Sequence, residues 1–234
     1  MRPKGFWRDV HSFFKENNFV YLFVSLTSLL FVSTLILELP GRTGADLFSA
    51  ITVLMIVTSI KSVKHKFDWK RIGYMLASVF LVLALFSRVT ESKIFAFALL
   101  ALLLIFFIGM FMAVVKDVLF HGEVDANKII GSISLYMLLG LVWAVIYLML
   151  LSFDPKAFSG IEPGDWQETF ASVAYYSFVT LTTLGYGDIL PKNHVAEFFV
   201  YMEAIIGVFY MAIIVSSLVS LMLSSTQKRK KTKQ

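Results

Sequence analysis

Six long apolar runs divide this 234-residue chain, and short polar loops separate them. A helix needs about 20 mostly apolar residues to cross the hydrocarbon core of a bilayer. Hydrophobic residues make up 58% of the chain and charged residues 16%, whereas soluble domains contain about 25% charged residues. We therefore expect an all-α membrane protein with six transmembrane helices. The expected spans are residues 19–37, 45–60, 72–86, 94–115, 129–151 and 195–222.

A seventh apolar stretch, residues 166–181, lies between the last two runs and leads into a glycine-rich segment. At about 1.5 Å per residue, a helix of this length is about 24 Å long, which is too short to cross the membrane and return. The stretch predicts a re-entrant helix followed by a loop. Asp165 and Glu168, three positions apart, predict a capping box at its start.

The segment that follows, residues 183–188, reads Thr-Leu-Gly-Tyr-Gly-Asp. Glycine reaches backbone angles that other residues avoid, so this run can hold several consecutive carbonyl groups pointing to the same side. The run resembles the signature of tetrameric potassium channels, which has valine where this chain has Leu184. The order from residue 129 onward (span, re-entrant helix, glycine run, span) resembles the pore module of that family over residues 129–224.

The resemblance implies a homotetramer, because one filter strand per chain cannot close a ring. It also implies K⁺ as the transported ion, held by carbonyl oxygens that replace its hydration shell. The implied filter ligands are the carbonyls of Thr183, Leu184, Gly185 and Tyr186, with the Thr183 hydroxyl. The residues expected to support the filter are Gly187, Asp188, Tyr175, Tyr176 and Glu203.

Two of these interpretations leave alternatives open. Glu203 is an acid deep in an apolar helix. A charged side chain is energetically costly inside a membrane, so such a residue is by default a candidate for a functional role. It either braces the short helix through a hydrogen bond, contacts the ion, or forms local hydrogen bonds without a functional role. Tyr175 and Tyr176 either hydrogen-bond near the filter or pack as aromatic side chains.

The last span is expected to line the inner cavity, where apolar rings can gate a pore by dewetting. Gly207 is interpreted either as a bending point or as space for close packing. The expected gate and cavity residues are Gly207, Val208, Met211, Val215 and Val219.

Basic residues predict the orientation, since cytoplasmic loops carry an excess of lysine and arginine. The loop after the second span and the end of the chain are both basic, which predicts that both termini lie in the cytoplasm and the glycine run outside. We expect the protein in the plasma membrane. Residues 1–18 predict an interfacial helix. Anionic lipids suit the basic loop and the tail at 225–234. Because the basic residues lie in short loops, nucleic acid is not an expected partner.

Residues 19–115 are expected to form a four-helix front domain that resembles a voltage sensor in topology, joined by a linker (116–128) to the two-helix pore domain at 129–224. Residues 94–115, the fourth span, contain no charged side chain. Voltage sensing needs several charges in the field, so we expect no steep voltage dependence.

The sequence thus predicts a potassium-selective channel without charged voltage sensors. Two alternatives remain: a non-conducting accessory membrane subunit, and a weakly selective cation channel to which the Leu184 substitution points. An enzyme is not expected, because the chain shows no nucleophile–base pair, metal cluster or phosphate-binding loop.

Overall fold

The computed structural model describes residues 18–36, 42–60, 62, 67–90, 93–120, 126–162, 164–217 and 219–220. The expected interfacial helix at 1–18, apart from Asn18, and the basic tail at 225–234 lie outside the described residues. So do residues 121–125, in the middle of the expected linker. Helices α5 and α6 occupy the two ends of that linker.

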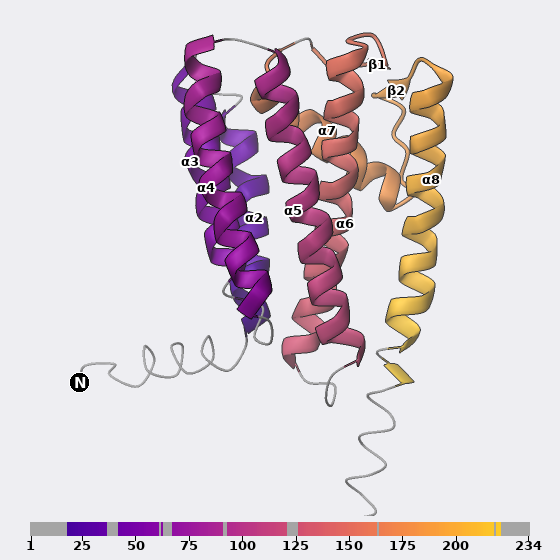
Figure 1. Cartoon of the computed structure of the whole chain (residues 1–234). Helices are drawn as coiled ribbons and strands as arrows, with labels where there is room; N and C mark the ends of the chain where they lie inside the picture. Colours follow the sequence, from indigo (N-terminus) through magenta and orange to yellow (C-terminus); the bar gives the residue numbers. More distant parts are fainter. Residues whose placement is uncertain are drawn as a thin grey trace, which may run out of the picture.

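The described part of the chain is mostly helical, and its non-helical loops lie on either side of α7 (Figure 1). The long helices are α2 (Asn18–Ile36), α3 (Arg42–Ile60), α4 (Phe67–Thr90), α5 (Lys93–Phe120), α6 (Ala126–Phe153) and α8 (His194–Tyr210). Helices α3 to α6 extend beyond the expected apolar runs, whereas α8 ends at Tyr210, before the end of its run. The short elements are β1 (Phe158–Ser159), α7 (Trp166–Leu181), β2 (Leu190–Pro191) and the π-helical turn η1 (Met211–Val215).

Four of the described segments are long and apolar enough to cross a membrane: Asn18–Leu35, Lys93–Leu119, Asn127–Phe153 and His194–Ile214. Two shorter apolar helical stretches, Gly44–Ile60 and Arg71–Ser87, belong to α3 and α4. Helices suit lipid because they satisfy every backbone hydrogen bond within one segment. These findings support an all-α membrane protein.

The front helices pack against the pore half of the same chain. Helix α2 contacts both α6 and α7, and α3 contacts α7. Phe48 of α3 is buried, and its ring centroid lies 4.9 Å from that of Phe170 and 5.6 Å from that of Trp166, both on α7. The Phe19 backbone N–H donates to the Asn127 side chain at 3.0 Å, which joins α2 to α6. One hydrophobic core therefore runs through both halves.

The pore half begins with α6, and α7 follows it; in Figure 1, α7 runs obliquely behind α6, and its end lies between α6 and α8. Strands β1 and β2 pair antiparallel, with Phe158 opposite Pro191 and Ser159 opposite Leu190. This small ladder ties the loop before α7 to the segment after the glycine run. Both ends of the re-entrant unit are thus fixed to each other.

Candidate functional site

Helix α7 starts at the expected residue, but the predicted capping box is wrong. Asp165 is the N-cap with extended backbone angles, yet its side chain makes no capping hydrogen bond. Its carbonyl instead accepts from the backbone N–H and the hydroxyl of Thr169, each at 3.0 Å. Because Asp165 is exposed, water can solvate its carboxylate, and the Thr169 hydroxyl adds a second hydrogen bond to the Asp165 carbonyl.

The carboxyl end of α7 turns sharply into the glycine run. Thr182 N–H donates to the Phe178 carbonyl at 3.0 Å, and Thr183 N–H donates to the Thr180 carbonyl at 2.9 Å. Thr183 has a φ of 60°, a left-handed conformation that is uncommon for a residue other than glycine. The chain thus reverses direction immediately after the helix.

The next two amides also point back at α7. The N–H groups of Leu184 and Gly185 both donate to the Val179 carbonyl, at 2.9 and 3.4 Å. A planar trans peptide places its carbonyl opposite its N–H, and there are no cis peptide bonds among the described residues. The carbonyls of Thr183 and Leu184 therefore point away from α7.

Gly185 and Gly187 have φ values of 58° and 80°, a region that glycine occupies without a steric penalty. Tyr186 lies between them and is 67% exposed, and Leu184 is 59% exposed. In this single chain the predicted ligands thus form one continuous ribbon. The carbonyls of Thr183 and Leu184 face the side opposite the helix.

The two tyrosines of α7 differ in their surroundings. The Tyr175 hydroxyl donates to Asp188 Oδ2 at 2.8 Å, and this bond lowers the pKa of Asp188 from its usual value. Tyr176 is buried, with its ring centroid 5.4 Å from that of Tyr147 and 5.5 Å from that of Phe158. One tyrosine therefore bonds to the end of the glycine run, and the other packs in an aromatic cluster.

Glu203 is fully buried on α8 and faces α6 and α7. Its Oε1 lies 2.5 Å from the Ser177 hydroxyl, and its Oε2 accepts a hydrogen bond from the Tyr147 hydroxyl. The Ser177 oxygen also lies 2.7 Å from the Gly140 carbonyl. Ser177 has only one proton for these two acceptors, so both contacts form when Glu203 is neutral and donates to Ser177. Through these contacts, the Glu203 side chain joins α8 to α6 and to α7.

Gly207 lies where α8 meets the end of α7. A Cβ atom at this position would be 2.4 Å from the Leu181 carbonyl oxygen, closer than real Cβ contacts allow. The Tyr136 hydroxyl donates to the same carbonyl at 3.1 Å. The missing side chain thus brings the backbone of α8 against the last turn of α7, and the π-helical turn at Met211–Val215 follows after Tyr210.

The remaining residues expected to form the gate and cavity lie on α8, in η1 and beyond it. Val208, Met211 and Val219 are each more than half exposed. Val215 lies in the π-helical turn, but its side chain is outside the described part.

Sequence reasoning missed the hydrogen-bond partners of the buried tyrosines and the π-helical turn. The tyrosines in the apolar spans could have indicated these hydrogen bonds, because a buried tyrosine hydroxyl usually needs a polar partner. Tyr210, whose hydroxyl donates to the Ser132 carbonyl at 2.6 Å, is a further example. The π-helical turn has no comparable marker in the apolar run that contains it.

Comparison with known proteins identifies one family. Residues 133–224 match a family model described as "Ion channel". Comparisons with curated proteins and with solved structures gave no match. The matched segment, less than half of the chain, contains most of α6, all of α7, the glycine run and α8. This match favours a non-enzymatic transport role and supports an ion channel domain at 133–224 in an integral membrane protein.

Proposed function

We propose that the chain is one subunit of a homotetrameric, potassium-selective channel that conducts passively. The observation that carries the proposal is the pair of hydrogen bonds from Leu184 and Gly185 to the Val179 carbonyl. They turn the carbonyls of Thr183 and Leu184 to one side. Four such ribbons around an axis would supply stacked rings of oxygen ligands, as potassium filters do.

Four copies are required because each chain contributes one ribbon. Phe198, Tyr201 and Ile205 leave an apolar face of α8 exposed in the single chain. Leu184 and Tyr186 in the glycine run are exposed as well. Contact with neighbouring subunits would bury these side chains and favour assembly.

The proposed topology has six spans, with both termini in the cytoplasm of a cell whose plasma membrane contains the channel. In this topology α3 and α4 also cross the membrane. Their apolar stretches are shorter than those of the other spans, and polar residues at the helix ends complete the crossing. The support is the excess of lysine and arginine in the loop after the second span and in the tail, which favours the cytoplasmic side. Anionic lipids at these basic segments are proposed partners.

The proposed channel lacks steep voltage gating. The charged residues of α5 are Lys93, Lys116 and Asp117, all near its ends. Moving one charge across 100 mV supplies about 2.3 kcal/mol, so a helix without charges in its central part gains little from the membrane potential. Open probability should change only shallowly with voltage.

The test is ion flux through purified protein in liposomes loaded with K⁺ and diluted into Na⁺. We expect rapid K⁺-driven flux that barium blocks. Gly185→Ala should abolish it, because alanine is strained at a φ of 58°. Gly164→Ala, in the loop before α7, should preserve flux, because the atom nearest to its Cβ would be a carboxylate oxygen of the flexible Glu168 side chain at 2.9 Å.

Two other results would contradict the proposal. Equal flux with Na⁺ as the sole cation would indicate a weakly selective cation channel. No flux from a correctly assembled protein would indicate a non-conducting accessory subunit.

A further inference from the structure

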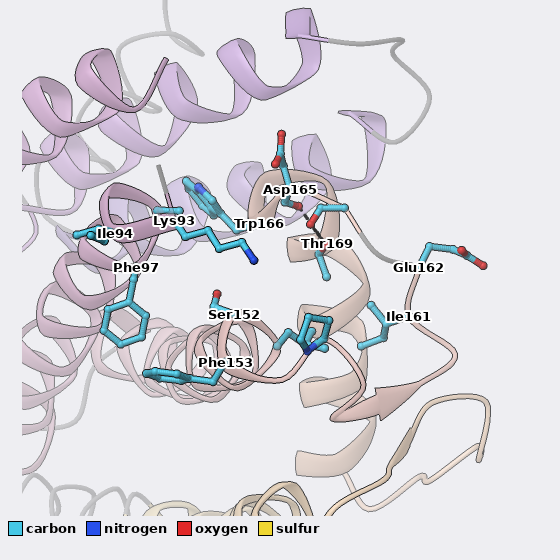
Figure 2. A pocket seen from close by; sticks show the side chains of 14 residues that line it. Lys93, Ile94, Phe97, Ser152, Phe153, Ile161, Glu162, Asp165, Trp166 and Thr169 are labelled. Atoms are coloured by element: carbon cyan, nitrogen blue, oxygen red, sulfur yellow. Dashed lines mark hydrogen bonds between the residues drawn. The ribbon is translucent and has the colours of Figure 1, made fainter. Parts of the chain in front are cut away.

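Helix α7 meets its neighbours differently at its two ends. At its first turn, Trp166 and Thr169 line a cavity of about 560 Å³ that also borders the start of α5 and the end of α6 (Figure 2). At its last turn, Leu181 is 1% exposed, and its carbonyl group meets both α6 and α8. The glycine run begins two residues later, at Thr183. The contacts of Leu181 are therefore the ones next to the proposed filter.

The carboxyl end of α7 satisfies its backbone carbonyl groups in two ways. The last four carbonyls of a helix have no partner within the helix itself. In α7, the carbonyls of residues 178–180 accept from the backbone N–H groups of residues 182–185. The fourth carbonyl, that of Leu181, accepts from the Tyr136 hydroxyl of α6 at 3.1 Å. The chain after the helix thus satisfies three of these groups, and a side chain of another helix satisfies the last.

Helix α8 encloses the same Leu181 carbonyl. A Cβ atom at Gly207 would lie 2.4 Å from its oxygen, so the α8 backbone already lies against this group. Because Leu181 is buried, its carbonyl would lack a partner without the Tyr136 hydroxyl, and an unpaired buried carbonyl is costly. An N–H group of the glycine run could relieve that cost. If one moved from Val179 to Leu181, its peptide plane would rotate and turn the carbonyl of the same plane.

A second tyrosine provides an internal comparison. The ring centroid of Tyr210, on α8, lies 5.2 Å from that of Tyr136. The Tyr210 hydroxyl also donates to a backbone carbonyl, that of Ser132 on α6, at 2.6 Å. The two tyrosines thus pack together and make the same kind of bond. The Tyr136 bond ends on α7, whereas the Tyr210 bond ends on α6.

We propose that Tyr136 is a positioning residue for the ion site, an assignment that rests on the proposed function. Its hydroxyl occupies the Leu181 carbonyl, so the N–H groups that bond to Val179 stay there. The carbonyls of Thr183 and Leu184 then remain on the side where the ion binds. Tyr136 acts through Leu181 and not by contact with the ion.

The expected effect is a weaker apparent affinity for K⁺. Without the Tyr136 hydroxyl, the glycine run divides between the arrangement that binds K⁺ and one with a turned carbonyl. The apparent dissociation constant rises as the fraction of the binding arrangement falls. Loss of one ordinary hydrogen bond can raise it by about two- to tenfold.

The test is isothermal titration calorimetry of K⁺ binding to the purified full-length assembly. The starting buffer contains N-methylglucamine chloride in place of K⁺, at constant ionic strength. Tyr136→Phe keeps the ring and removes the hydroxyl, and it should raise the dissociation constant for K⁺ by about two- to tenfold. Thermal denaturation in K⁺-free buffer measures the stability of the same variant separately.

The matched control is Tyr210→Phe. It removes a hydrogen bond between α6 and α8, so it should lower the melting temperature and leave the dissociation constant for K⁺ unchanged. If Tyr136→Phe lowers only the melting temperature, its role is merely structural and the proposal is wrong. An equal rise of the dissociation constant in both variants would overturn it as well.

A variant that keeps the hydroxyl covers the case in which Tyr136→Phe does not assemble. Fluorotyrosine incorporated in place of Tyr136 retains the ring, and its more acidic hydroxyl is a stronger donor. The dissociation constant for K⁺ should then fall below that of the unaltered protein. An unchanged or higher value would contradict the proposal.

Hydrogen exchange separates this proposal from the proposed function, because it requires no bound ion. In K⁺-free buffer, mass spectrometry should show faster exchange of the amides of residues 183–185 in Tyr136→Phe than in Tyr210→Phe. Equal exchange in the two variants would refute the role of Tyr136. If the unaltered protein binds K⁺ and Na⁺ equally, potassium selectivity is refuted, and faster exchange in Tyr136→Phe alone would still support the hold on the end of α7.

Discussion

Replacing Glu203 separates its hydrogen bonds from its charge. In Glu203→Gln, the amide oxygen can accept from Tyr147 and the amide N–H can donate to Ser177, which reproduces the neutral acid. In Glu203→Ala, the Tyr147 hydroxyl loses the partner that the structure gives it, and a cavity opens between α6, α7 and α8. The two variants should therefore differ strongly.

The magnitude follows from these contacts. A buried polar group left without a partner costs about 1–3 kcal/mol, and the cavity adds a further penalty. Ser177 keeps its bond to the Gly140 carbonyl, so only the Tyr147 hydroxyl is left unpaired. We expect Glu203→Ala to lower the free energy of unfolding by about 3 kcal/mol. Glu203→Gln should lie within about 1 kcal/mol of the unaltered protein.

The assay is thermal denaturation of the detergent-purified assembly, with K⁺ flux in liposomes as a second readout. Glu197→Gln is the matched control, because this acid of the same helix is exposed and its carboxylate contacts His194 at the surface. It should change stability by less than about 0.5 kcal/mol. If Glu203→Gln is as unstable as Glu203→Ala while Glu197→Gln is unaffected, a charged carboxylate is required and the neutral arrangement is wrong.

Three further outcomes are expected. Asp188 has a lowered pKa because Tyr175 donates to it, so the bond stabilises the filter segment above about pH 4 and is lost as pH falls through the lowered value. Tyr175→Phe should make K⁺ flux fail at a higher pH than in the unaltered protein, and identical pH profiles would contradict this. Gly207→Ala should destabilise the assembly by about 1–3 kcal/mol, because its Cβ would meet the Leu181 carbonyl at 2.4 Å; an unchanged melting temperature would contradict that close approach. Leu184→Val should change the selectivity for K⁺ over Na⁺ or the rate of current decay, both measured in bilayer recordings. If neither changes, the hypothesis that Leu184 alters the stability of the filter is wrong.

Local patterns in the sequence predicted much of the fold. Apolar runs placed the helices to within several residues, because hydropathy directly reports which segments a bilayer can hold. The short stretch before the glycine run was expected to be a helix, and α7 covers it from Trp166 to Leu181. The left-handed angles at Gly185 and Gly187 also follow from residue type.

The rest depends on contacts between distant parts of the chain. The cluster of Tyr147, Ser177 and Glu203 joins three helices, and no spacing within one helix reveals it. The predicted capping box did not form, although both residues of the motif are present, since the Asp165 side chain makes no capping hydrogen bond. A local motif states which bonds are available to a residue, whereas tertiary packing decides which of them form.

The buried Phe48 has a consequence for how the protein is put together. Its ring lies against α7 of its own chain, so the first and last thirds of each polypeptide meet without help from another copy. A newly inserted chain can finish this packing alone, so the proposed tetramer would form from subunits that are already folded. Assembly would then require little rearrangement inside each subunit, and a substitution of Phe48 would appear as misfolded single chains before assembly.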